Sequence, residues 1–232
     1  MTTNYMPDNQ IKNISIPIGK FYGPCSGHDV TFAIENFASE VNNFVFCDVN
    51  YRQNTMKSFK YLPKCCLDWE LISRKFKQDK SNLIKKIPNS NKSFHTFCTI
   101  DNWLRPDGTI VVVEFWCDLA EDILVSQFDT NSISVFMHIN DGESEGGSNL
   151  WFLEAKECSQ NKYLLNRMFL SVVADRLVER ALIVTDGKLT HHKFSRQRSF
   201  NLVGICWEYI AEIKGNRVKD RVASLWRACI NN

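Results

Sequence analysis

The chain has 232 residues, of which 44% are hydrophobic and 23% are charged, and its formal net charge is +2. These values are typical of an ordinary soluble globular protein that is long enough to bury a substantial core. No apolar run approaches the roughly 18 residues that span a bilayer, and the N-terminus lacks a secretory signal pattern, so we expect a cytoplasmic protein without a membrane partner.

The nine cysteines are scattered, and no C-x2-C pair occurs. This spacing argues against a zinc ribbon and favours reduced thiols that pack as small hydrophobic side chains. No metal site is therefore predicted from the cysteines. Residues 1–16 read as a flexible lead-in, and 17–232 as a single domain that carries an inserted basic element at 51–93.

The first organised segment predicts a strand, a tight turn, a helix and a second strand. Residues 18–22 form a short run of β-formers, and Gly23–Gly27 (GPCSG) breaks the chain sharply. Apolar residues recur at helical spacing from Val30 onward, and residues 44–47 form a second strand that ends at Asp48.

The chemistry expected of this segment comes from its turn and its acid. The first amides of a helix lack intrahelical partners and carry the positive end of the dipole, so they attract a phosphate or a carboxylate. Asp48, about 20 residues after the turn, is placed to accept the two hydroxyls of a ribose. This arrangement is typical of a nucleoside-binding βαβ unit.

The run FYGPCSG, followed by a helix and FVFCDVNY, resembles the first two motifs of Rossmann-like (class I) S-adenosylmethionine-dependent methyltransferases. Gly23 and Gly27 match the outer glycines of a divergent first motif, in which Cys25 replaces the middle glycine. Phe21 stands where this family has an acid. The resemblance implies a site for S-adenosylmethionine formed by Gly23, Cys25, Gly27 and Asp48.

Within the inserted element the pattern predicts a short helix around Leu67–Lys77. Two β-rich runs, 94–104 and 109–116, flank Arg-Pro-Asp-Gly and predict a hairpin. A helix should follow from Leu119 to about Phe128. Asp118 precedes this helix and occupies the place where the methyltransferase family has the acid that contacts adenine; the alternative is a plain N-cap.

Residues 132–139 predict a buried strand, which leads into a loop (141–149) with three carboxylates and three glycines. In the methyltransferase family the corresponding loop faces the methyl acceptor. The resemblance therefore implies that Asp141 and Glu145 face the group that is modified, with an acid such as Asp141 as the base. Asp141, Glu143 and Glu145 could instead bind a divalent cation, or the loop could be merely solvated.

The last third of the chain predicts a helix over Tyr163–Leu177, a strand over 181–185, a β-rich run over 202–213 and a helix over 218–230. The succession of elements predicts an α/β fold: a mainly parallel Rossmann-like sheet with helices on both faces, plus the basic insertion and the hairpin.

Positive charge is concentrated in two segments. Residues 52–92 hold eleven basic and three acidic side chains, and residues 188–227 hold nine and three, giving net charges of +8 and +6. Such segments could bind nucleic acid, or they could be solvated lysine-rich faces.

We therefore predict a methyltransferase-like protein that binds S-adenosylmethionine or a related nucleoside, with in-line methyl transfer to an unidentified acceptor. One alternative is a non-catalytic domain of the same fold that binds nucleic acid or protein. A second is a Mg²⁺-dependent nuclease, because Asp141 and Glu154-x-Lys156 resemble the PD-(D/E)xK motif.

Overall fold

The computed structural model describes residues 14–27, 30–52, 66–78, 84–87, 91–139, 173–185, 199–202, 204–214 and 222–230. The chain forms two compact units. Unit 1 comprises Met1–Gly19 and Asp129–Asn232, and unit 2 comprises Lys20–Phe128. Unit 2 contains the five residues that the sequence assigns to the cofactor site.

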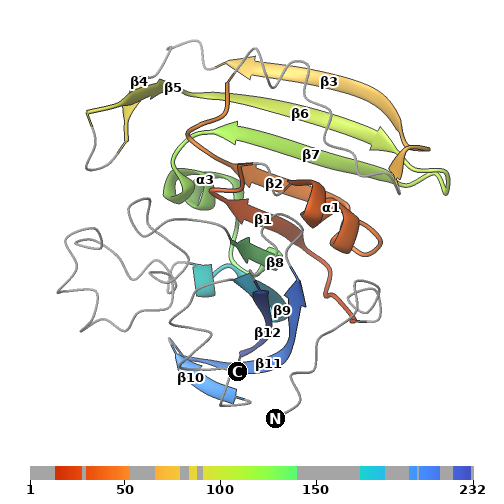
Figure 1. The fold of residues 1–232 in the computed structure, drawn as a ribbon, viewed down its shortest axis with the longest axis vertical. Helices are drawn as coiled ribbons and strands as arrows, with labels where there is room; N and C mark the ends of the chain where they lie inside the picture. Colours follow the sequence, from red (N-terminus) through yellow and green to blue (C-terminus); the bar gives the residue numbers. More distant parts are fainter. Residues whose placement is uncertain are drawn as a thin grey trace. The chain divides into compact units, whose positions relative to one another are not determined.

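The predicted strand–turn–helix–strand segment of unit 2 is confirmed (Figure 1). It consists of β1 (Lys20–Pro24), α1 (Val30–Phe37) and β2 (Asn43–Cys47), and β1 pairs with β2 in parallel. The helix forms because its apolar residues share one face, and these are buried: Val30, Phe32, Ala33, Ile34 and Phe37.

Three more strands extend this sheet in the order β1-β2-β7-β6-β3. β7 (Ile110–Cys117) is parallel to β2, whereas β6 (Phe97–Leu104) is antiparallel to β7, and β3 (Glu70–Gln78) is antiparallel to β6. The predicted hairpin is confirmed as β6 and β7. Its turn is closed by the amide of Arg105, which donates to the carbonyl of Thr109 at 2.9 Å.

Aromatic rings fill the core beneath α1. The ring centre of Phe21 lies 5.5 Å from that of Phe37 on the helix and 5.1 Å from that of Phe44 on β2. Phe46 and Phe115 stack at 5.7 Å. All five rings are at most 1% exposed, and burial of each such side chain stabilises the fold by about 1.5–3 kcal/mol.

The predicted helix after β7 is confirmed as α3 (Ala120–Gln127). The hydroxyl of Tyr22 donates to the carbonyl of Ala120 at 2.6 Å, and its ring lies 4.8 Å from that of Phe128. These contacts attach α3 to the side of β1 that the Tyr22 side chain occupies.

A separate two-stranded antiparallel hairpin consists of β4 (Ile84–Lys86) and β5 (Ser93–His95). Phe94 is buried and Lys85 is half-buried, whereas Lys86 and the other strand residues are exposed. One face of the hairpin therefore packs against the protein and the other meets solvent.

The described strands of unit 1 follow the order β10-β11-β12-β9-β8. β8 and β9 are parallel, and the other pairs are antiparallel. Trp207 and Trp226 are at most 1% exposed in its core. The strands predicted at 132–139 and 181–185 are confirmed. The bounds are β8 (Ile133–His138), β9 (Leu177–Thr185), β10 (Ser199–Leu202), β11 (Ile205–Lys214) and β12 (Val222–Ile230).

The predicted fold class, a mainly parallel α/β Rossmann-like sheet with helices on both faces, is wrong. Strands dominate the described residues, which contain only the helices α1 and α3, and the sheets are mixed rather than mainly parallel. The prediction generalised from one real βαβ segment to the whole chain, whereas most of the described strands pair with antiparallel neighbours.

Two predicted helices are strands. The segment predicted as a helix around Leu67–Lys77 is largely β3, and the tail predicted as a helix over 218–230 is β12 where it is described. In β12 the residues Ala223 to Trp226 are all buried between β9 and β11. Because both faces of the strand are buried, its apolar residues do not alternate with polar ones, and their pattern imitates helical spacing. The helix predicted over Tyr163–Leu177 lies largely outside the described residues, and β9 already begins at Leu177.

Among the described residues, no helix is long and apolar enough to cross a membrane.

Candidate functional site

The candidate site lies where the three parallel strands β1, β2 and β7 end. After β1 the chain turns back, and the amide of Ser26 donates to the carbonyl of Cys47, the last residue of β2, at 3.2 Å. Cys25 and Gly27 have φ values of 51° and 45°. The left-handed conformation is costly for a non-glycine residue such as Cys25, so the tight turn stores strain of about 1–2 kcal/mol.

Gly23 has a packing role within β1. A Cβ at this position would lie 3.0 Å from Cδ1 of Phe46 and 3.1 Å from Cε1 of Phe21. A larger residue would therefore crowd the aromatic core at this position, independently of any approach by a ligand.

Asp48 closes the turn onto the end of β2. Its Oδ2 accepts the amide of Gly27 at 2.8 Å, and its Oδ1 accepts the amide of Asn50 at 2.7 Å. The residue is 9% exposed. The predicted convergence of the glycine turn and the acid is thus present, and the carboxylate is oriented by two charge-assisted hydrogen bonds.

A buried hydroxyl pair supports the same turn. The hydroxyls of Ser26 and Tyr51 lie 2.7 Å apart, and the Tyr51 ring meets Phe115 edge-on at 5.9 Å. Burial raises the pKa of Tyr51 well above its ordinary value, although the hydrogen bond to Ser26 opposes this shift. Tyr51 therefore stays protonated near neutral pH and fixes the chain after Asp48.

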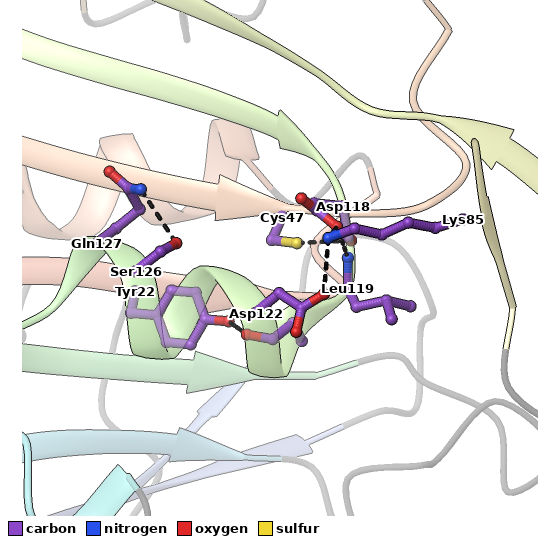
Figure 2. Close-up of polar contacts among 9 residues, drawn as sticks. Tyr22, Cys47, Lys85, Asp118, Leu119, Asp122, Ser126 and Gln127 are labelled. Carbon is purple, nitrogen blue, oxygen red and sulfur yellow. Dashed lines mark hydrogen bonds and ion pairs between the residues drawn. The ribbon is translucent and has the colours of Figure 1, made fainter. Parts of the chain in front are cut away.

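Asp118, one strand further along the edge, carries an ion pair. Figure 2 shows Lys85 reaching the carboxylates of Asp118 and Asp122 at the start of α3, with Nζ–O distances of 2.6 and 2.7 Å. Desolvation lowers the pKa of Lys85, but the two hydrogen-bonded carboxylates outweigh it, and the pKa lies above its ordinary value. Oδ1 of Asp118 also accepts the amide of Leu119 at 2.7 Å.

A thiol links the second and third strand ends. Sγ of Cys47 donates to the carbonyl of Asp118 at 2.9 Å. Burial raises the pKa of Cys47 well above its ordinary value, and the charges of Asp118 and Asp48 add to this effect. Cys47 is consequently a protonated hydrogen-bond donor rather than a nucleophile.

The structure thus brings together five of the seven residues that the sequence assigns to the site: Gly23, Cys25, Gly27, Asp48 and Asp118. Asp141 and Glu145 lie outside the described residues, as do Glu154 and Lys156 of the alternative nuclease motif. The N-cap alternative for Asp118 is not what is observed, since Leu119 is the N-cap of α3 and has no side-chain capping bond.

Two residues of the site were missed by the sequence analysis. Tyr51 follows Asp48 by three residues, and its position beside the acid was a usable signal. Lys85 is one of eleven basic residues in 52–92, and nothing in its local pattern distinguishes it from the others. In the part of the chain that the structure describes, no group of His, Cys, Asp and Glu side chains could hold a metal ion.

Searches with protein-family models and against curated proteins found no match to this chain.

Proposed function

We propose that the edge formed by the ends of β1, β2 and β7 binds S-adenosylmethionine or a related nucleoside. The observation that carries this proposal is the contact between Asp48 and Gly27, in which the acid that would hold a ribose lies at the glycine turn. In open sheets, ligands bind outside the carboxyl ends of parallel strands, which is where these residues lie.

Asp48 would accept hydroxyl groups of the ribose. A carboxylate offers about four lone-pair positions, and the amides of Gly27 and Asn50 each occupy one of them. Because these amides fix the carboxylate in place before the ligand arrives, little orientational freedom is lost on binding. Asp118 would then face the amino group of the adenine.

If the nucleoside is a methyl donor, the reaction is an in-line methyl transfer governed by the positioning of the acceptor. The assignment of Asp141 and Glu145 as its catalytic residues rests on the resemblance to the methyltransferase family alone. The proposal includes the cytoplasmic setting that the sequence predicts, and it leaves the acceptor unassigned.

Thermal unfolding with S-adenosylmethionine and with its demethylated product tests the proposal. A ligand that binds only the folded state should stabilise it by about 2.7 kcal/mol at a concentration 100-fold above the dissociation constant. Asp48→Asn should abolish the shift, while Asp68→Asn, at an exposed position of the same unit, should keep it. Because Asp48→Asn also removes charge from the turn, its far-ultraviolet circular dichroism must match that of the parent. Absence of any shift in the parent protein at millimolar ligand would refute the proposal.

A second candidate, nucleic-acid binding through the basic segments, is favoured by the exposure of Lys75 and Lys77 on the edge strand β3. In segment 188–227, desolvation and the neighbouring positive charge of Arg180 lower the pKa of Arg227, although the nearby Glu208 opposes this shift. Retention of a labelled single-stranded oligonucleotide should then fall steeply with salt and weaken in Lys75→Glu/Lys77→Glu. Equal retention by this variant and by the parent would exclude β3 as the contact.

A further inference from the structure

Ion pairs of Lys85 connect the β4–β5 hairpin to the candidate site. It forms a sheet of its own, distinct from the sheet that contains β1, β2, β7, β6 and β3. A two-stranded hairpin is at best marginally stable by itself, so contacts of its side chains must hold it in place. Phe94 supplies an apolar contact surface, and Lys85 supplies ion pairs to Asp118 and Asp122.

These ion pairs differ in their setting. The side chains of Lys85 and Asp118 are 22% and 14% exposed, whereas Asp122 is 51% exposed. Screening by water and salt is weaker for the less exposed pair, so the contact between Lys85 and Asp118 is the stronger one.

Lys85 therefore occupies the carboxylate that the proposed function assigns to the nucleoside. Oδ1 of Asp118 accepts hydrogen bonds from both the Lys85 ammonium group and the amide of Leu119. A ligand can therefore hydrogen-bond to this oxygen only where the ammonium group leaves room. Figure 2 shows the ammonium group lying directly at the two carboxylates.

We infer that Lys85 is an electrostatic latch that holds the β4–β5 hairpin against Asp118 and restricts the access of ligands to the end of β7. This inference rests on the proposed function for the identity of the ligand, but the latch itself has a readout that needs no ligand. A nucleoside that bonds to Oδ1 of Asp118 competes with the Lys85 ammonium group. Its apparent association constant is therefore multiplied by the fraction of molecules in which the latch is open.

The test compares Lys85→Met, which keeps the length of the side chain and removes its charge, with Lys86→Met at the neighbouring exposed position. Hydrogen–deuterium exchange reports on the hairpin amides at 84–87 and 91–95, including the Ile87 amide that donates to the carbonyl of Lys92 at 2.9 Å. Exchange should be faster in Lys85→Met than in Lys86→Met. In the parent it should quicken when the salt is raised from about 0.05 to about 0.5 M.

Calorimetric titration with S-adenosylmethionine supplies the second readout. Loss of a partly exposed ion pair is expected to tighten binding by about 5-fold in Lys85→Met, with no change in Lys86→Met. Equal hairpin exchange in the two variants would overturn the latch. Faster exchange combined with unchanged or weaker binding would overturn its control of access. Faster exchange in a protein that binds the ligand in neither form would support the latch and refute the proposed function.

Discussion

The carboxylate of Asp101 on β6 accepts two hydrogen bonds from the guanidinium group of Arg74 on β3, at 2.7 Å from Nε and 2.6 Å from Nη2. Asp101 is fully buried, and the Arg74 side chain is 22% exposed. The two residues face each other directly in the strand register. This bidentate pair therefore fixes both the position of the edge strand and the charge balance of the interior.

Loss of the Arg74 guanidinium group should destabilise the folded protein. In Arg74→Met the buried carboxylate of Asp101 loses its partner, and we expect the free energy of unfolding to fall by about 3–5 kcal/mol. Urea unfolding followed by tryptophan fluorescence measures the change. Lys75→Met, at the exposed neighbouring position, should lower stability by no more than about 0.5 kcal/mol. Similar losses in the two variants would show that Arg74 acts through general charge rather than through Asp101.

Three glycine substitutions separate crowding from backbone strain. Gly23→Ala places a methyl group against Phe46 and Phe21 and should destabilise unit 2 by about 1–3 kcal/mol. Gly108 has a φ of 84° with open space around it, so Gly108→Ala should cost only the strain of the left-handed conformation, about 1 kcal/mol.

Gly27→Ala combines positive φ with an ordinary contact of 3.5 Å to Oδ2 of Asp48. Its cost should therefore resemble that of Gly108→Ala, as measured by the same urea titration. A cost for Gly23→Ala below that of Gly108→Ala would contradict the assignment of Gly23 to aromatic packing.

The sequence was sufficient for the first βαβ segment because several local signals agree there. The glycine turn, the helical spacing from Val30 and the apolar strand before Asp48 each predict the observed element, and the contact between Gly27 and Asp48 follows from two neighbouring parallel strands. The hairpin of β6 and β7 was predictable for the same reason.

Long-range pairing explains the failures. The prediction of the fold class was wrong because β3 pairs with β6, and β12 pairs with β9 and β11, and no local pattern shows this pairing. The ion pair between Lys85 and Asp118 joins residues 33 positions apart through a hairpin whose docking depends on the folded unit. Sequence spacing therefore predicted that Asp48 and Asp118 follow neighbouring strands, but not the cation that pairs with Asp118.

The hydroxyl pair of Ser26 and Tyr51 allows a double-mutant cycle. Ser26→Ala or Tyr51→Phe alone leaves the other buried hydroxyl without its partner, and each should lower the free energy of unfolding by about 1–3 kcal/mol. The double variant should lose clearly less than the sum of the two, because no hydroxyl is then stranded. Strict additivity would show that the two hydroxyls do not depend on each other.

Buried thiols and phenols should make the protein sensitive to alkali. Burial raises the pKa of the Cys117 thiol to about 12. It is also the largest cause of the raised pKa values of four other groups: Tyr22, Tyr51, Cys47 and Cys98. In the unfolded chain these groups ionise at their ordinary values, about 8.5 for Cys and about 10 for Tyr. Above those values the unfolded state binds fewer protons than the folded state. The contribution of these groups to stability is therefore fully present below about pH 8.5 and is lost as the pH rises.

Each such group should lower the free energy of unfolding by about 1.4 kcal/mol per pH unit between its unfolded and folded pKa values. Urea unfolding at intervals from about pH 7 to about pH 11 measures this slope. Above pH 9, the free energy of unfolding of Cys117→Ser should fall less steeply than that of the parent, by the contribution of one group, about 1.4 kcal/mol per pH unit. Below about pH 8, where the thiol is protonated in both states, the curves of variant and parent should run parallel and serve as the internal control. A constant free energy of unfolding across the alkaline range would contradict the prediction, because it would mean that water reaches these groups in the folded protein.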